Sequence, residues 1–198
     1  PQAFCVVPGP GFLNATAALS TAYAVNAPVL ALAGQIPLGA QGKGHGLLHE
    51  IPDQFGILER LTKSAHRVTG ATDAASTIAT AFRDLASGRP QPVGLEIAVN
   101  LWMQTVEGAV PDLVPETVTA PQPDSTAIDD AASLIAAARA PMIVVGGGAQ
   151  DDAEAVQALA KRIGAPVVAF RTGHGVMPSD DPLSIGMPMA HSLWPHVD

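Results

Sequence analysis

The loop between residues 34 and 54 carries the side chains best suited to chemistry. His49 is followed directly by Glu50, and Gln35 opens the loop. A neutral imidazole beside a carboxylate can donate or shuttle a proton near neutral pH, which makes His49 a candidate catalytic residue. A long glycine-rich connection is usually functional, but a mobile surface loop and a structural histidine remain open alternatives.

Metal and covalent chemistry are disfavoured. His45 and His49 lie four residues apart, but Gly44 and Gly46 argue against the helix that would align them, and a zinc site needs further ligands. The sequence has no G-x-S-x-G motif. Its single cysteine, Cys5, lies within an apolar run and is predicted to be a buried, inert thiol.

A second candidate site follows the apolar run at residues 3–7, where Pro8-Gly9-Pro10-Gly11-Phe12-Leu13-Asn14 precedes an alanine-rich run. A strand that ends at two glycines and continues as a helix directs backbone N–H groups and the helix dipole at one crevice. The pattern predicts binding of a small anion or a polar ring at Gly9, Pro10, Gly11 and Asn14.

A third candidate lies near the end of the sequence. Gly146, Gly147 and Gly148 form a strand-to-helix turn that suits a nucleotide phosphate, although the G-x-G-x-x-G spacing is absent and a purely structural tight turn is the alternative. Arg171 follows the next strand, where it would pair with a phosphate or with Asp180 or Asp181.

Apolar strand-like runs alternate with helix-like runs, which predicts an α/β fold with a parallel sheet and flanking helices. The predicted strands of the first half are residues 3–7, 28–33, 65–68 and 92–98, and the predicted helices are 13–24, 52–61 and 74–87. The candidate loops follow the strands, and open parallel sheets bind ligands at the carboxyl ends of their strands.

The alternation stops in a proline-rich stretch and then resumes. We therefore expect a first domain at 1–105, a linker at 106–124 and a second, Rossmann-like domain at 125–198. In the second domain the predicted helices are 125–138 and 152–163, and the predicted strands are 141–145 and 166–170. With only two clear strands, this domain is expected to be incomplete.

Composition limits the classes of function. The 198 residues are 47% hydrophobic, enough for a sizeable core, and the formal charge of −8 argues against a nucleic-acid partner. No apolar run is long enough to span a bilayer, and a single cysteine is typical of an intracellular, cytoplasmic protein. Because it opens on Pro1 instead of Met, the sequence is expected to be part of a longer protein.

Three motifs in order resemble one family: Gly9-Pro10-Gly11-Phe12-Leu13-Asn14, then Ala18-Leu19-Ser20-Thr21-Ala22-Tyr23, then Pro28 through Gly34-Gln35-Ile36-Pro37. They resemble the pyrimidine-binding domain of thiamine-diphosphate enzymes of the acetolactate synthase and benzaldehyde lyase group. Residues 61–68 and 88–97 resemble that domain's closing segments, and residues 125–186 resemble the start of its central domain.

The resemblance implies a lyase or transferase that decarboxylates a 2-oxo acid or joins the resulting fragment to an aldehyde or second oxo acid. It implies thiamine diphosphate and Mg²⁺ bound between subunits of a homodimer or homotetramer, with the Gly9 loop beside the pyrimidine ring. His49 and Gln35 would position or protonate the substrate oxygen. In some members the central domain binds FAD or ADP, which would involve Gly146, Gly147, Gly148 and Arg171.

By the same resemblance, the catalytic glutamate would precede Pro1 and the metal-binding diphosphate domain would follow Asp198. The isolated chain is therefore expected to be inactive and to bind thiamine diphosphate weakly. Two alternatives compete with this interpretation: a non-catalytic nucleotide-binding (ADP or FAD) module, and a structural or regulatory α/β protein.

Overall fold

The chain folds into two compact units, Pro1–Thr119 and Ala120–Asp198, and each is described by itself. The computed structural model describes residues 2–107, 118–119 and 121–197. Part of the predicted linker, residues 108–117 and 120, lies outside the described residues.

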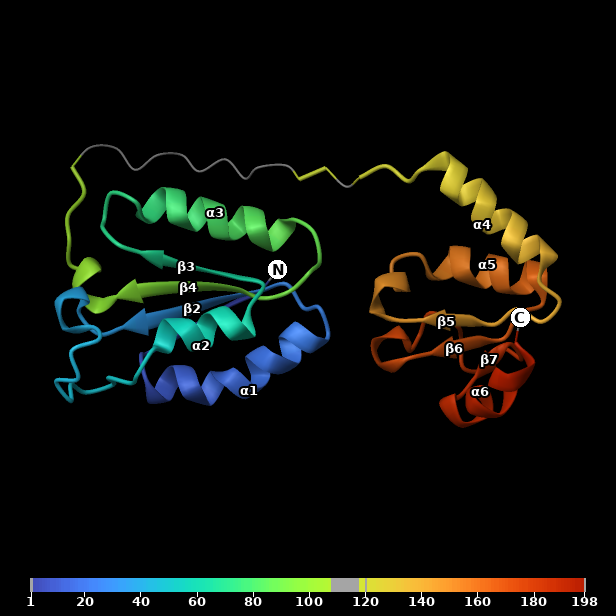
Figure 1. Ribbon diagram of the computed structural model, residues 1–198, viewed down its shortest axis with the longest axis horizontal. Helices are drawn as coiled ribbons and strands as arrows, with labels where there is room; N and C mark the ends of the chain where they lie inside the picture. Colours follow the sequence, from blue (N-terminus) through green and yellow to red (C-terminus); the bar gives the residue numbers. More distant parts are fainter. Residues whose placement is uncertain (1, 108–117, 120, 198) are drawn as a thin grey trace. The chain divides into compact units, whose positions relative to one another are not determined.

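Unit 1 contains a sheet of four parallel strands in the order β1-β2-β4-β3. Its elements in chain order are β1 (Gln2–Val6), α1 (Pro10–Ala24), β2 (Val29–Gln35), a 3-10 turn at Leu38–Ala40, α2 (Gln54–Leu61), β3 (Ser64–Val68), α3 (Ala74–Ala86), β4 (Val93–Ala98) and a 3-10 turn at Val99–Leu101. The predicted α/β fold with a parallel sheet and flanking helices is confirmed (Figure 1).

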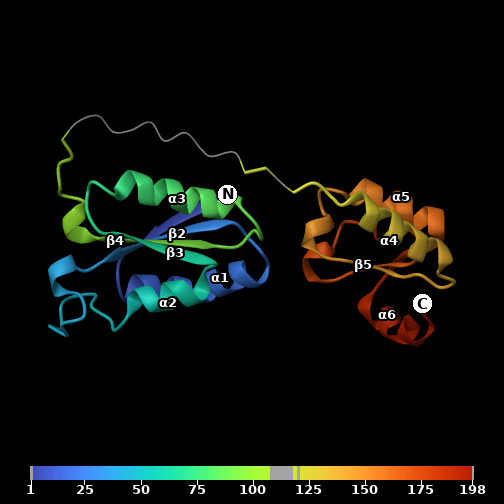
Figure 2. The ribbon, with the colours of Figure 1, turned by 45° about the horizontal axis from the view of Figure 1, so that its top comes forward.

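Helices cover both faces of this sheet, α3 on one and α1 with α2 on the other (Figures 1 and 2). Alternate strand residues point to opposite faces. Leu30, Val93 and Leu95 pack with Leu85 and Ile78 in the α3 layer. The opposite layer is built from Phe12, Leu19, Ala31, Ala33 and Leu58. Two apolar layers therefore hold the sheet, and the central strand β4 is buried along its whole length.

The prediction that Cys5 is buried is wrong, because its thiol is exposed. It lies in β1, which pairs only with β2 among the described strands and alternates between exposed and half-buried residues. An apolar run predicts a strand covered on both faces, but it does not reveal whether that strand lies at an edge.

Helix α2 packs directly on the sheet at Gly94. A Cβ at Gly94 of β4 would stand only 2.6 Å from Cγ of the fully buried Leu58, so the absence of a side chain there lets the helix approach. The helix begins at Gln54 instead of the predicted Pro52, and Asp53 caps it by accepting a hydrogen bond from the Gly56 N–H at 3.1 Å. This packing fixes the first turn of α2 beside β4.

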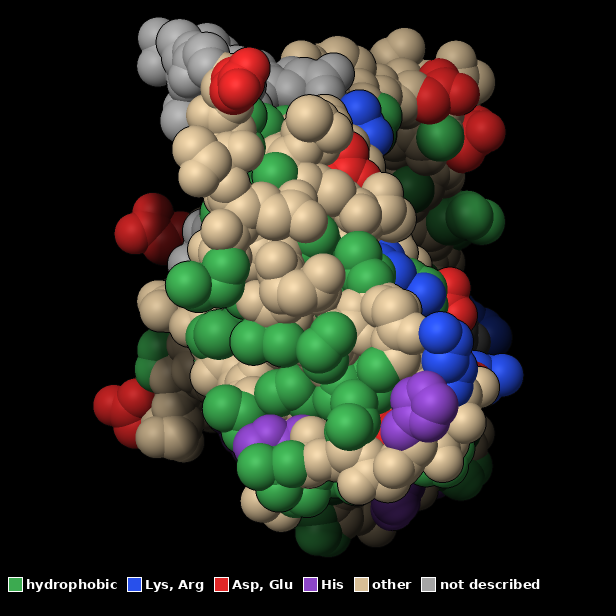
Figure 3. Space-filling view, turned by 90° about the vertical axis from the view of Figure 1, so that its left-hand side faces the viewer, with side chains coloured by type: hydrophobic (Ala, Val, Ile, Leu, Met, Phe, Trp, Pro, Cys, Tyr) green, Lys and Arg blue, Asp and Glu red, His purple; other side chains and the backbone are tan. Residues whose placement is uncertain are grey.

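The carboxyl ends of the strands form one edge of the sheet, which Figure 3 faces. Exposed apolar side chains gather in the loops that follow β2 and β4, namely Leu47, Leu48, Val99, Trp102 and Met103. This edge also carries the loops that the sequence singled out, those after Val6 and after Gln35.

Unit 2 is a smaller parallel sheet in the order β5-β6-β7. Its elements are α4 (Ser125–Ala137), β5 (Ile143–Val145), α5 (Ala153–Ile163), β6 (Val167–Ala169), β7 (Ser184–Ile185) and α6 (Met187–Leu193), with 3-10 turns at Gly147–Ala149, Arg171–Gly173 and Trp194–His196. The third strand, which the sequence pattern did not indicate, is only two residues long. Val145, Val167 and Ala160 lie in the core between the sheet and α5.

Among the described residues, none of the helices is both long and apolar enough to cross a membrane.

Candidate functional site

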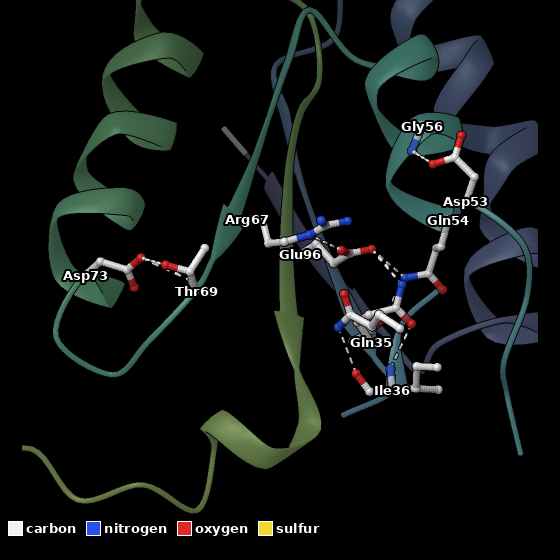
Figure 4. Close-up of polar contacts among 11 residues, drawn as sticks. Gln35, Ile36, Asp53, Gln54, Gly56, Arg67, Thr69, Asp73 and Glu96 are labelled. Carbon is white, nitrogen blue, oxygen red and sulfur yellow. Dashed lines mark hydrogen bonds and ion pairs between the residues drawn. The ribbon is translucent and has the colours of Figure 1, made fainter. Parts of the chain in front are cut away.

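A fully buried carboxylate, Glu96, lies at the centre of the polar residues beneath the carboxyl edge of unit 1 (Figure 4). It belongs to β4 and shares the α2-facing side of that strand with Gly94. Its Oε2 accepts hydrogen bonds from Gln35 Nε2 and Gln54 Nε2, both at 3.0 Å. Its Oε1 accepts one from Arg67 Nε at 2.7 Å. β2, α2 and β3 thus each contribute one partner.

Gln54 connects this cluster to the loop after β1. Its Oε1 accepts the Gly9 N–H at 2.7 Å, and its Nε2 donates to the Gly34 carbonyl oxygen at 2.8 Å as well as to Glu96. Gly9 is buried with φ at +59°, and a Cβ there would collide with the backbone of His49. The structure therefore brings Gly9 and His49 together through their backbones, with Gln54 beneath them.

The Gly9 N–H is donated to Gln54 within the chain, so this donor is already used, and binding of an anion or a polar ring by the loop stays a prediction. Glycine is required at this position because the backbone comes very close to His49. Of the other residues predicted for this loop, Pro10 and Asn14 are exposed and Gly11 is half-buried. They lie in the first turns of α1.

Gln35, the other predicted catalytic residue, is the last residue of β2 and is almost fully buried. Its Oε1 accepts the Ile36 N–H at 2.8 Å while its Nε2 donates to Glu96. It lines a pocket of about 360 Å³, within the range of small-molecule sites. The pocket lining also includes Ile36, Gln41, Glu50, Ile51, Asp53, Gln54, Phe55 and Arg67.

The charged groups of this pocket are held by internal contacts. The Arg67 guanidinium lies 4.3 Å above the Phe55 ring while its Nε donates to Glu96. The Leu47 N–H donates to Glu50 Oε2 at 2.9 Å, and this bond lowers the pKa of the Glu50 carboxyl. Glu50 therefore braces its own loop. His49 has φ at +70°, a left-handed conformation that is rare outside glycine.

The candidates in unit 2 lie in two turns that pack on each other. A Cβ at Gly147 would stand 2.7 Å from Thr172 Oγ1, and one at Gly173 would collide with the Val145 carbonyl. Gly146 and Gly148 have open space around them. The exposed Arg171 lies 5.2 Å above the Phe170 ring. Asp181, one of its predicted alternative partners, lies 3.4 Å from Lys161 Nζ.

A second pocket, of about 380 Å³, lies in unit 2 between the sheet and α6. It is lined by Val144, Val168, Phe170, Met187, Ala190, His191 and Trp194, a nearly apolar set. Among the described residues, no group of three or more His, Cys, Asp or Glu side chains is placed to hold a metal ion.

The sequence reasoning did not single out Glu96, Gln54 or Arg67 as a cluster. One local signal was available. Glu96 is the only charged residue within the predicted strand at 92–98, and a charge inside a buried strand needs partners. The partners themselves become visible only once the strand order places β4 between β2 and β3.

Comparisons with known proteins agree with the resemblance. Residues 1–57 match the family model described as "Thiamine pyrophosphate enzyme, N-terminal TPP binding domain". Residues 128–195 match the one described as "Thiamine pyrophosphate enzyme, central domain". The first match includes Gly9, His49 and Gln54, whereas Arg67 and Glu96 lie outside both.

Similar curated proteins include a probable 2-ketoarginine decarboxylase from Pseudomonas aeruginosa, 34% identical over 91% of this chain. The acetolactate synthase isozyme 1 large subunit from Escherichia coli is 30% identical over 93% of the chain. A probable acetolactate synthase large subunit from Methanocaldococcus jannaschii is 32% identical over 92%. The chain spans 32% of the length of each of these relatives. Two domain models and these similarities place the chain in the thiamine pyrophosphate enzyme family.

Proposed function

We propose that this chain supplies the pyrimidine-binding side of a thiamine-diphosphate site in a decarboxylase or carboligase that acts on 2-oxo acids or aldehydes. The observation that carries the proposal is the contact between the buried, left-handed Gly9 and the backbone of His49 at the carboxyl edge of the sheet. It joins two segments that the family model covers, and it lies where open parallel sheets bind ligands.

The residues present fit the cofactor. A side chain at position 9 would collide with the His49 backbone, so glycine lets the two loops that line the site lie in contact. The adjoining pocket combines an aromatic ring, Phe55, with the polar side chains of Gln35 and Gln41, a lining that suits a flat polar ring. Bound thiamine diphosphate supplies carbanion-stabilising chemistry, while the protein contributes orientation and exclusion of water.

Within this proposal His49 orients or protonates the substrate oxygen. Its backbone is fixed against Gly9, and its loop is braced by the Glu50 carboxylate. Gln35 acts by orientation, since its carboxamide already bonds Glu96 and the Ile36 N–H. Magnesium, assembly into a homodimer or homotetramer and a cytoplasmic location belong to the proposal through the family resemblance.

The rival function, a non-catalytic module that binds ADP or FAD, has less support. Gly147 is accounted for by its close packing against Thr172, and Arg171 stacks on Phe170. The pocket in unit 2 is lined almost entirely by apolar side chains and offers no Lys or Arg for a phosphate.

The full-length protein provides the test. Calorimetric titration with thiamine diphosphate and Mg²⁺ should show binding, and release of CO2 should be assayed with pyruvate and with 2-ketoarginine. His49→Ala should lower kcat by about a hundredfold, a typical loss for a general acid or base. His45→Ala, in the same exposed loop, should leave kcat unchanged. Binding of ADP without thiamine diphosphate would instead favour the rival, and equal kcat values for the two variants would exclude His49.

A further inference from the structure

Glu96 is a charged group buried in the middle of an otherwise apolar strand. All six residues of β4 are buried, and Glu96 itself has no exposed surface. Removing a carboxylate from water is costly unless ionic and hydrogen-bonding partners compensate. The residues that bind the Glu96 carboxylate therefore indicate the role of its buried charge.

Three donors converge on this carboxylate from three different elements (Figure 4). Arg67 Nε reaches Oε1 from β3, while Gln35 Nε2 and Gln54 Nε2 reach Oε2 from β2 and α2. The Arg67 guanidinium pairs with the buried Glu96 carboxylate and stacks on Phe55, and 37% of the Arg67 side chain remains exposed. The ion pair between Arg67 and Glu96 thus connects the buried centre of the sheet to the lining of the pocket.

The two glutamines connect Glu96 to the backbone of the loops that follow β1 and β2. Gln54 Oε1 accepts the Gly9 N–H at 2.7 Å, and Gln35 Oε1 accepts the Ile36 N–H at 2.8 Å. Each glutamine therefore presents its amide nitrogen to Glu96 and its oxygen to a backbone donor. The loops after β1 and β2 are held through the same carboxylate.

The charge of Glu96 favours the orientation that both carboxamides adopt, and for Gln54 the Gly34 carbonyl oxygen, which also accepts from Nε2, favours the same orientation. An ionised carboxylate only accepts hydrogen bonds, so each glutamine must turn its nitrogen toward it. Because a carboxamide is planar, its oxygen then faces the opposite way, toward the Gly9 or Ile36 N–H. A neutral amide at position 96 could donate as well as accept, so only the Gly34 carbonyl oxygen would still require the Gln54 nitrogen, and the bond from the Gly9 N–H to Gln54 Oε1 would be held less firmly.

We propose that Glu96 is a positioning residue for the cofactor site: through Gln54 and Gln35 its carboxylate holds the Gly9 and Ile36 backbone in the conformation that receives thiamine diphosphate. The inference rests on the proposed function for its cofactor, but its structural half concerns only hydrogen bonds within this chain. Arg67 supports Glu96 by balancing its charge.

The test replaces Glu96 by Gln in the full-length protein. Asp84→Asn is the matched control, because Asp84 lies in α3 on the opposite face of the sheet and accepts hydrogen bonds from Ser64 and His66. Both variants change one partly or wholly buried carboxylate into an amide. Two quantities are measured, the Kd for thiamine diphosphate with Mg²⁺ and the amide hydrogen exchange of peptides that contain Gly9 or Ile36.

Glu96→Gln should weaken thiamine diphosphate binding by about tenfold, the loss expected for about one well-formed hydrogen bond at the loop. It should also accelerate exchange at Gly9 and Ile36, whereas Asp84→Asn should change neither quantity.

Unchanged exchange at Gly9 in Glu96→Gln would overturn the anchoring role. Accelerated exchange with wild-type affinity would overturn the relevance of Glu96 to the cofactor. Equal losses of thiamine diphosphate affinity in Glu96→Gln and Asp84→Asn would show that Glu96 only stabilises the fold. Absence of thiamine diphosphate binding in the unaltered protein would refute the proposed function and the cofactor role of Glu96 together. The exchange data would still decide whether the anchor exists.

Discussion

The close approach of Gly9 to His49 gives a sharp prediction for Gly9→Ala. Gly9 has φ at +59° and ψ at −117°, a conformation that residues with a Cβ rarely adopt. Gly88 has φ at +58° but has open space around the position of a Cβ. Gly88→Ala is therefore a control that carries the cost of a positive φ without the collision.

The expected losses of stability follow from the cost of the backbone conformation and from the collision with His49. A side chain held in a sparsely populated backbone region costs about 1–3 kcal/mol, and the positive φ brings a cost of this kind to both variants. At Gly9 the new methyl group would also lie 2.9 Å from the His49 carbonyl carbon and 3.0 Å from its Cα. Since these are backbone atoms that cannot rotate away, overpacking adds about 1–3 kcal/mol. Gly9→Ala should thus be the more destabilising by about 2 kcal/mol.

Urea unfolding measures this difference. The chain has two tryptophans, Trp102 in unit 1 and Trp194 in unit 2, so Trp194→Phe leaves Trp102 fluorescence as a reporter of unit 1 alone. With a slope of about 2 kcal/mol per molar urea, the midpoints of the two variants should differ by about 1 M. Equal midpoints would refute the close contact between Gly9 and His49.

Three further predictions concern the scaffold. Partial burial raises the pKa of the Asp84 carboxyl, but hydrogen bonds from Ser64 and His66 and the nearby His66 and Arg83 charges outweigh it and leave the pKa lowered. The stability that Asp84 contributes should therefore be present above the usual carboxyl range and be lost as pH falls through its folded pKa, and urea midpoints of Asp84→Asn should lack this share of the pH dependence. Gly94→Ala should destabilise unit 1 by about 1–3 kcal/mol through its contact with Leu58, with less than additive loss in the double variant with Leu58→Ala. Asp124→Ala should lower the free energy of unfolding of unit 2 by about 1 kcal/mol, because Asp124 accepts the Thr126 N–H at the start of α4; unchanged thermal unfolding of that unit would contradict the capping role.

The secondary structure was predictable because its signals are local. The apolar run at 92–98 became β4, Val93–Ala98, and the helix expected at 74–87 became α3, Ala74–Ala86. The start of α2 was misplaced by two residues, because Asp53 adopts a left-handed conformation with φ at +45° before the helix begins. Pro52, a common first helical residue, gave the wrong start.

The cluster around Glu96 was not predictable in the same way. Its partners Gln35, Gln54 and Arg67 lie 61, 42 and 29 residues away in sequence. They meet because β4 inserts between β2 and β3, although it follows both in the chain. Hydrophobic periodicity indicates which residues form strands, but it carries no information about the order of strands in the sheet. The contact between Gly9 and His49 depends on the same non-local arrangement.

The buried charge itself is better explained by orientation than by stability. An apolar side chain of similar volume would often stabilise a core as well as an ion pair does, because it avoids the cost of desolvation. An apolar residue at position 96 would remove the acceptor that the two carboxamides share, and it would leave the Gln54 nitrogen bonded only to the Gly34 carbonyl oxygen. A carboxylate permits only the orientation that presents both oxygens to the Gly9 and Ile36 N–H groups. Glu96 therefore specifies one conformation of the two loops, as a site that must receive a rigid cofactor ring requires.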